Sequence, residues 1–221
     1  MSSHDIYRRT RPDADPWSLL DCSTDRSYSA SFRRLWPLAV EWVRPYYDSF
    51  HLFQTVVWML RLDPDATEPL LVAALTHDME RHFPGGTQPD KAAGAWDDVE
   101  YNRRHARRSA DIVCAWLREQ EMPAHLVDAV QGPILEHEFG GSPDGDVIQA
   151  ADSLSFLDVN TDLVAAWVAN GETSLESAVK KLDWMYERIR LPRGTELARA
   201  LHERSVRTVR ATVTADAGRA A

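Results

Sequence analysis

Residues 71–83 read LVAALTHDMERHF, and this stretch decides the fold. Six consecutive apolar residues, Leu70–Leu75, lead through Thr76 into His77 and Asp78. His77 continues the apolar stripe of the residues three, four and seven positions before it, so it faces the same side of a helix. A buried carboxylate beside it is costly unless it is neutralised, paired with a cation or bound to a metal. The pair therefore indicates a buried helix that leads into a polar site.

Nearly all of the chain beyond about residue 30 shows helical spacing of apolar residues, and no stretch alternates as a strand would. We expect helices over about residues 32–43, 51–62, 67–81, 98–119, 124–137, 162–169, 175–190 and 195–212, with another from the turn at 140–146 to about 160. Gly132-Pro133 should interrupt the helix over 124–137. We predict an all-α fold with an irregular arm over residues 1–30 and one helical domain over 31–221. Its core would span about 45–160, and further helices would cover 161–215.

Composition excludes several classes of partner. With 221 residues and no linker-like stretch, the chain is expected to form one domain. A net charge of −9 and a pI near 5.3 argue against nucleic acid or an anionic membrane as the main partner. A small anionic substrate held by a local basic patch stays compatible with this charge.

Cysteine usage and the terminal sequence suggest the compartment. Cys22 and Cys114 form neither a CxxC pair nor a disulfide framework. The amino-terminal segment is polar, and no run approaches the roughly 18–20 apolar residues that span a bilayer. We expect a soluble, cytoplasmic protein, in which eight tryptophans leave room for an apolar interface such as that of a homodimer.

The pattern of His77 recurs in four further predicted helices, each with a polar residue on an otherwise apolar face. His105 is followed by small or apolar residues at offsets four, seven and eleven, and His137 is preceded by apolar residues at offsets three, seven and eleven. Asp152 lies on a similar stripe, and His51 opens an apolar helix. Five helices that each point such a residue inward can surround one metal centre, as helical bundles commonly do.

The order of these residues resembles the HD-domain superfamily of metal-dependent phosphohydrolases. The resemblance covers about residues 45–160 and is closest to members with the ligand set H…HD…H…H…D: His51, His77, Asp78, His105, His137 and Asp152. It implies a helical bundle around two metal ions bridged by Asp78. His51, His77 and Asp152 would complete the first site. His105 and His137 would complete the second, and only one ion would remain if both were structural.

The resemblance also implies a chemistry. Imidazoles and carboxylates suit borderline divalent ions, so we expect two ions of iron or manganese, with cobalt, nickel or magnesium as alternatives. The leading prediction is a metalloenzyme that uses a metal-bridging hydroxide to hydrolyse a phosphoester or phosphoanhydride bond in a small molecule, such as a nucleotide or sugar phosphate. A mixed-valence di-iron oxygenase that cleaves a C–C or C–P bond with O₂ shares the six ligands and is the alternative. A non-enzymatic bundle that binds a nucleotide or a partner protein is the third.

Residues next to the HD pair are candidates for catalysis besides Asp78 itself. Arg81 stands where many members of the superfamily have a lysine, so it could bind a substrate phosphate or form only a surface ion pair. Glu80 could orient a ligand or a water, or lie on an exposed face. The loop over residues 83–96 has the length and glycines of a mobile lid, although an ordinary surface loop explains it equally well.

Further basic residues are candidates for substrate binding. Arg104 and Arg108 lie next to His105 and one turn beyond it, and a solvated face is their simpler explanation. Lys181 and Arg188 are seven residues apart on one helix face, where they could contact a substrate phosphate or cover the core with their aliphatic stems.

Overall fold

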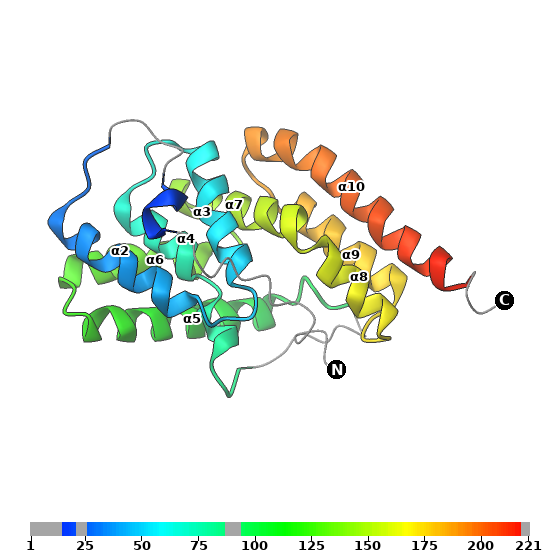
Figure 1. Cartoon of the computed structure of the whole chain (residues 1–221), viewed down its shortest axis with the longest axis horizontal. Coiled ribbons are helices and arrows are strands. Elements are labelled where there is room, and N and C mark those ends of the chain that lie inside the picture. Colours follow the sequence, from blue (N-terminus) through cyan, green and yellow to red (C-terminus); the bar gives the residue numbers. More distant parts are fainter. Residues whose placement is uncertain (1–14, 21–25, 87–93, 218–221) are drawn as a thin grey trace.

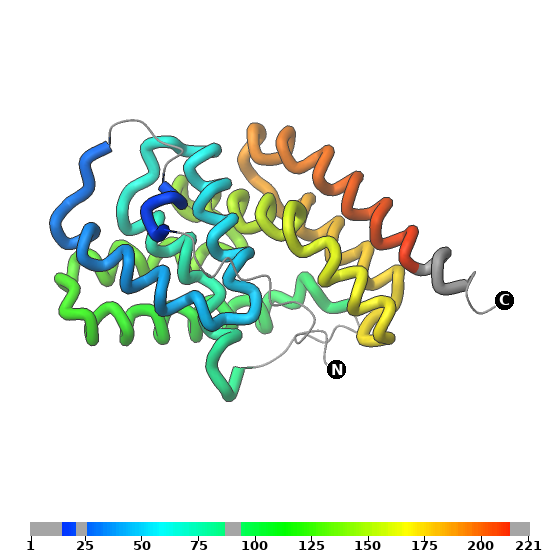
Figure 2. The backbone as a smooth tube through the Cα atoms, viewed as in Figure 1, coloured from blue at the N-terminus to red at the C-terminus, as the bar shows by residue number. Residues whose placement is uncertain are grey.

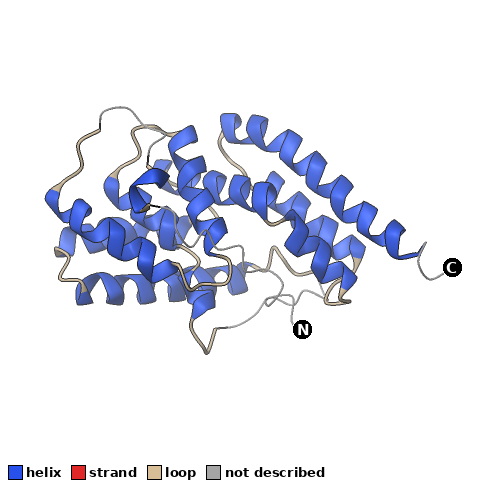
Figure 3. Ribbon diagram, in the orientation of Figure 1, coloured by secondary structure: helices blue, strands red, loops and turns tan. Residues whose placement is uncertain are grey.

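The computed structural model describes residues 15–20, 26–86 and 94–217. Every regular element within these ranges is a helix (Figure 3), so the predicted all-α fold is confirmed. Residues 1–14 and 21–25 of the predicted arm, and the middle of the predicted lid, lie outside the described residues. In the described part of the chain, no helix has the length and apolar character needed to cross a membrane.

The described elements are α-helices, except for η1 and η2, which are short 3₁₀ helices. They are η1 (Pro16–Leu19), α2 (Ala30–Val43), α3 (Ser49–Leu62), α4 (Glu68–Thr76), η2 (Met79–His82), α5 (Val99–Glu119), α6 (Ala124–Glu136), α7 (Pro143–Val159), α8 (Thr161–Ala169), α9 (Leu175–Glu187) and α10 (Pro192–Ala217). In Figure 2, helices α2 to α6 lie at one end of the molecule, and helices α8, α9 and α10 lie at the other.

Helix α7 is the centre of the arrangement (Figure 1). It packs against α3, α4 and α6 on one side and against α8, α9 and α10 on the other. Every residue from Ile148 to Leu157 is buried, because a helix surrounded by neighbours has no face left for solvent. Any polar side chain of α7 in this stretch must therefore find its partners inside the protein.

Side-chain caps define where several helices begin. In five of them a side-chain oxygen accepts a hydrogen bond from the backbone N–H three residues on: Ser29, Thr67, Asp98, Ser142 and Ser174. Serine, threonine and aspartate are preferred there because they satisfy an N–H that has no partner within the helix. The cap at Ser142, with Pro143 in the first turn, starts α7 inside the segment that was expected to be a turn over 140–146.

Several predicted boundaries are wrong. Helix α10 runs from Pro192 to Ala217, beyond both ends of the expected range 195–212. Helix α4 ends at Thr76 rather than near Arg81, and η2 follows it. Helix α6 continues through Gly132-Pro133, because the φ of proline fits a helix and the neighbouring Val130 and Ile134 are fully buried. Helix α9 ends at Glu187, three residues earlier than expected.

Candidate metal centre

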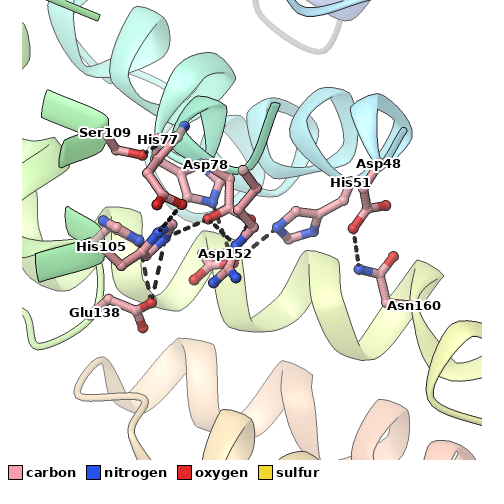
Figure 4. Close-up of polar contacts among 12 residues, drawn as sticks. Asp48, His51, His77, Asp78, His105, Ser109, Glu138, Asp152 and Asn160 are labelled. Carbon is pink, nitrogen blue, oxygen red and sulfur yellow. Dashed lines mark hydrogen bonds and ion pairs between the residues drawn. The ribbon is translucent and has the colours of Figure 1, made fainter. Parts of the chain in front are cut away.

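Three buried side chains from different helices meet around one carboxylate oxygen. Oδ1 of Asp152, on α7, lies 3.1 Å from Nε2 of His51 on α3 and 3.5 Å from Nε2 of His77, which directly follows α4. Figure 4 shows His51 and Asp152 facing each other across this group. The contact of α3 with α7 and of α4 with α7 brings the three together. We call His51, His77 and Asp152 the first triad.

A second group of the same kind lies beside the first. Oδ1 of Asp78 is 2.8 Å from Nε2 of His105 on α5, and one ligand atom each of Asp78, His105 and His137 lies within 4.8 Å of the others. His137 directly follows α6, and its ring centroid is 5.0 Å from that of His77. We call Asp78, His105 and His137 the second triad. The two triads are therefore neighbours at the centre of the molecule.

Two of the histidines are oriented by the ends of their own helices. Nδ1 of His77 lies 3.0 Å from the carbonyl oxygen of Ala74, and Nδ1 of His137 lies 2.6 Å from that of Ile134. A carbonyl can only accept, so Nδ1 carries the proton and Nε2 of the neutral ring keeps a lone pair. Each ring thus caps a carbonyl in the last turn of its helix and points Nε2 inward.

The other two histidines are oriented by side chains. The hydroxyl of Ser155 donates to the backbone carbonyl of His51 (2.8 Å) and accepts from Nδ1 of the same residue (2.9 Å). Nδ1 of His105 donates to Oε2 of Glu80 over 3.1 Å. In all four rings an outer partner holds Nδ1 and leaves Nε2 toward the centre, which is the arrangement that metal-binding histidines usually have.

The inward nitrogens fit a metal ion better than they fit the protein alone. Nε2 of His77 and Nε2 of His137 are buried and have no hydrogen-bond partner among the described residues. Leaving such a polar atom unpaired typically costs about 1–3 kcal/mol. Two donors about 2.1 Å from one ion lie about 3.0 Å apart at a right angle and about 3.4 Å apart at the tetrahedral angle. The 2.8–3.5 Å distances within the triads match this spacing. These groups can therefore hold metal ions.

Two arginines balance the carboxylates of the triads. Burial alone would raise the pKa of Asp78, but Arg81 and His105 hold it well below its usual value. Arg188 does the same for Asp152, whose Oδ2 it contacts directly. Nε of Arg188 also donates to the hydroxyl of Ser153 over 2.8 Å. The carboxylates of both triads are therefore ionised, as they would have to be to bind a metal.

A pocket that is partly open to solvent reaches both triads. His51, Asp78 and Asp152 are part of its wall, which is otherwise rich in aromatic rings: Tyr46, Tyr47, Trp96, Tyr101, Phe156 and Trp167. Its described cationic residues are Arg81, Lys181 and Arg188. The pocket could therefore admit a small anionic molecule that also has an apolar part.

Three predicted substrate residues reach this pocket. Nε of Arg81 lies 3.2 Å and 3.3 Å from the two carboxylate oxygens of Asp78, and its Nη1 donates to the hydroxyl of Tyr101 over 2.9 Å. Nζ of Lys181 is 4.4 Å from the centre of the Trp184 ring. Burial lowers the pKa of Lys181 to about 7. Arg188, the third, is held by the contacts described above.

The remaining predicted residues lie elsewhere. Arg104 is exposed, and the wall of the pocket as described includes neither Arg104 nor Arg108. Arg108 donates to Oε1 of Glu80 over 3.1 Å. Glu80, predicted as a catalytic residue, is buried between Arg108 and Nδ1 of His105, on the side of that ring away from the centre. Asp78, in contrast, does line the pocket; it was predicted to bridge two ions and belongs to the second triad.

Several residues of the site were not identified from the sequence. Tyr46, Tyr47 and Asp48 form the turn between α2 and α3 and line the pocket. Nδ2 of Asn160 donates to Oδ2 of Asp48 over 2.8 Å (Figure 4), and burial raises the pKa of Asp48 to about 6. Because a turn has no periodicity, the only sign in the sequence that these residues belong to the site is their position just before His51.

The chain stands apart in each comparison with known proteins. No family model matches it, and neither a curated protein nor a solved structure does. The resemblance to the HD-domain superfamily therefore stays a prediction from the motif, and the chemistry of the site rests on its own geometry.

Proposed function

We propose that this protein is a metal-dependent hydrolase of a phosphoester or phosphoanhydride bond in a small molecule. The observation that carries the proposal is the pair of adjacent triads, with their buried histidines and inward Nε2 atoms, at the base of a pocket that contains cations. The first triad would hold one ion and the second triad another, with iron or manganese favoured by the mixed donors. Divalent ions there would supply Lewis-acid activation of a phosphoryl oxygen and of the attacking water.

The residues of the chain itself would bind and orient the substrate. Among the described cations of the pocket, Lys181 is the least engaged with carboxylates, because its Nζ lies over aromatic rings, and it would attract an anionic group. Arg81 is fixed by Asp78 and Tyr101 and would add positive charge near the same group. The aromatic wall would pack against the apolar part of the substrate and exclude water.

Metal analysis tests the centre. Anaerobically purified protein should contain about two equivalents of metal, and His105→Ala should reduce this to one or fewer. His125→Ala is the matched control, because His125 is exposed and outside both triads. Two equivalents retained by His105→Ala would refute the assignment of two ions.

Activity tests the reaction. Phosphate should be released from a member of a panel of nucleotides and phosphomonoesters when Mn²⁺ is added. Oxygen consumption by the iron-loaded protein, with the paramagnetic signal of a coupled Fe(II)/Fe(III) pair and no phosphate release, would instead show the oxygenase. A protein that holds no metal would refute both enzymes.

A further inference from the structure

Besides Asp78, Glu138 is a second carboxylate that lies beside the inward Nε2 atoms of the second triad. It follows His137 in sequence, and its side chain is only 7% exposed. Oε1 of Glu138 is 3.6 Å from Nε2 of His137 and 3.9 Å from Nε2 of His105, as the dashed lines at His105 in Figure 4 indicate. The carboxylate therefore faces the same nitrogens that face Asp78.

No hydrogen bond explains this position. Both distances exceed the 3.2 Å or so that is normal for an N–H···O hydrogen bond. Nδ1 of His137 already donates to Ile134, so a neutral ring has no proton on Nε2 to give to Glu138. Within the described part of the chain, the only hydrogen bond to the Glu138 carboxylate comes from Arg188, at Oε2. In the neutral ring of His137, Oε1 thus faces a lone pair on Nε2, which would repel it unless a cation lay between them.

We infer that Glu138 is a further ligand of the ion at the second triad, beyond the six residues that the sequence motif supplies. The inference rests on the proposed metal centre. Donors on one ion lie about 3.0–3.4 Å apart, so Oε1 needs to move by only a few tenths of an ångström to join His105 and His137. Such a movement is within the freedom of a glutamate side chain.

Arg188 is the positioning residue for this arrangement. Its Nη1 pairs with Oε2 of Glu138, and its Nη2 pairs with Oδ2 of Asp152. In each carboxylate the other oxygen, Oε1 or Oδ1, faces histidine nitrogens of a triad. One planar guanidinium therefore holds a carboxylate of each metal site, and its fixed geometry would set their separation.

A second carboxylate changes what the second site prefers. With Glu138 the ion would have two imidazoles and two carboxylates, so the charge of a divalent ion is balanced by its ligands. The greater share of oxygen donors favours manganese or iron over softer ions. Glu138 also lines the pocket, so it would occupy the face of the second ion that is turned toward the substrate.

Titration of the metal-free, full-length protein with Mn²⁺ tests the inference through binding, without any activity. Wild type should show two sites by calorimetry. Glu138→Gln should retain one site unchanged and bind the other about 10- to 100-fold more weakly. Glu136→Gln is the matched control: Glu136 flanks His137 on the other side and accepts from the hydroxyl of Ser142, so both sites should be unchanged.

The outcomes separate this inference from the proposed function. Two sites of wild-type affinity in Glu138→Gln would overturn the role of Glu138 while leaving the metal centre intact. No Mn²⁺ or Fe²⁺ binding by wild type would overturn both. Should Glu138→Gln fail to fold, Glu138→Asp retains the charge but withdraws the oxygen by one methylene, and it should also weaken a single site. Loss of the same site in His137→Ala would identify that site as the second triad.

Discussion

Replacing Arg188 with methionine should destabilise the metal-free protein strongly. The side chain is 6% exposed and contacts the carboxylates of Asp152 and Glu138, so its removal leaves two buried charges without their cation. Breaking a buried ion pair from one side typically costs about 3–5 kcal/mol. In a chain of this length 1 kcal/mol moves Tm by about 2–4 °C, so we expect a Tm lower by about 6–20 °C.

Saturating Mn²⁺ should restore much of this loss. If ions occupy the triads, they face the same two carboxylates and replace the missing positive charge. The difference in Tm between Arg188→Met and wild type should therefore fall to less than half of its value without metal. Arg190→Met is the control, because Arg190 pairs with Asp146 at 2.9 Å but is 56% exposed. Exposed pairs contribute about 0–1 kcal/mol, and metal should make no difference to that variant.

Thermal unfolding of both variants, with and without Mn²⁺, is the measurement. Since Arg188 lowers the pKa of Asp152 and Glu138, its stabilisation is present above the usual carboxyl pKa of about 4 and is lost as pH falls through the lowered values. The curves of wild type and Arg188→Met should therefore converge in acid. An Arg188→Met loss that is equally large with and without metal would show that no ion lies near these carboxylates, and the reasoning would fail.

Three further predictions follow from single contacts. Burial raises the pKa of Asp48 to about 6, so its ionisation makes the protein less stable as pH rises from about 4 to 6. In urea denaturation, the free energy of unfolding of Asp48→Asn should therefore exceed that of wild type by up to about 3 kcal/mol at pH 8 and by almost nothing at pH 4. The pKa of Lys181 is lowered to about 7, so kcat/KM for an anionic substrate should fall as pH rises through 7, and Lys181→Arg should move this decline to a higher pH. Ser142 caps α7, so Ser142→Ala should cost about 1 kcal/mol in the same denaturation assay.

Periodicity identified the candidate ligands because each is a polar residue on an apolar stripe. A side chain such as His105 or Asp152, placed among apolar residues at helical spacing, has to face the core of the bundle. The same reasoning explains the errors. Arg104 is adjacent to His105 in sequence, but consecutive residues of a helix point about 100° apart, so Arg104 is exposed. Lys181, in contrast, was a candidate and does line the pocket, which it reaches from α9, a helix that is distant in sequence and packs against α7.

Residues outside the periodic segments could not be placed in this way. Tyr46, Tyr47 and Asp48 line the pocket from a turn, where no repeating pattern indicates which side chain faces inward. The end of α4 was also misjudged, because helix propensity continues through Met79 and Glu80. What ends that helix is a contact of the His77 ring with the backbone carbonyl of Ala74.

That contact connects the fold to the site. In a continuous helix the neighbours His77 and Asp78 would diverge by about 100° and could not both face the centre. The ring of His77 takes the carbonyl of Ala74, which would otherwise accept from the N–H of Asp78, and the chain leaves the helix at that residue. The same arrangement is found at the end of α6. Nδ1 of His137 donates to the carbonyl of Ile134, and the carboxylate of the following residue, Glu138, faces the second triad. Each histidine thus both ends its helix and allows the acid after it to face the same centre, which is why two helices of the bundle end in the middle of the molecule with a histidine followed by an acid.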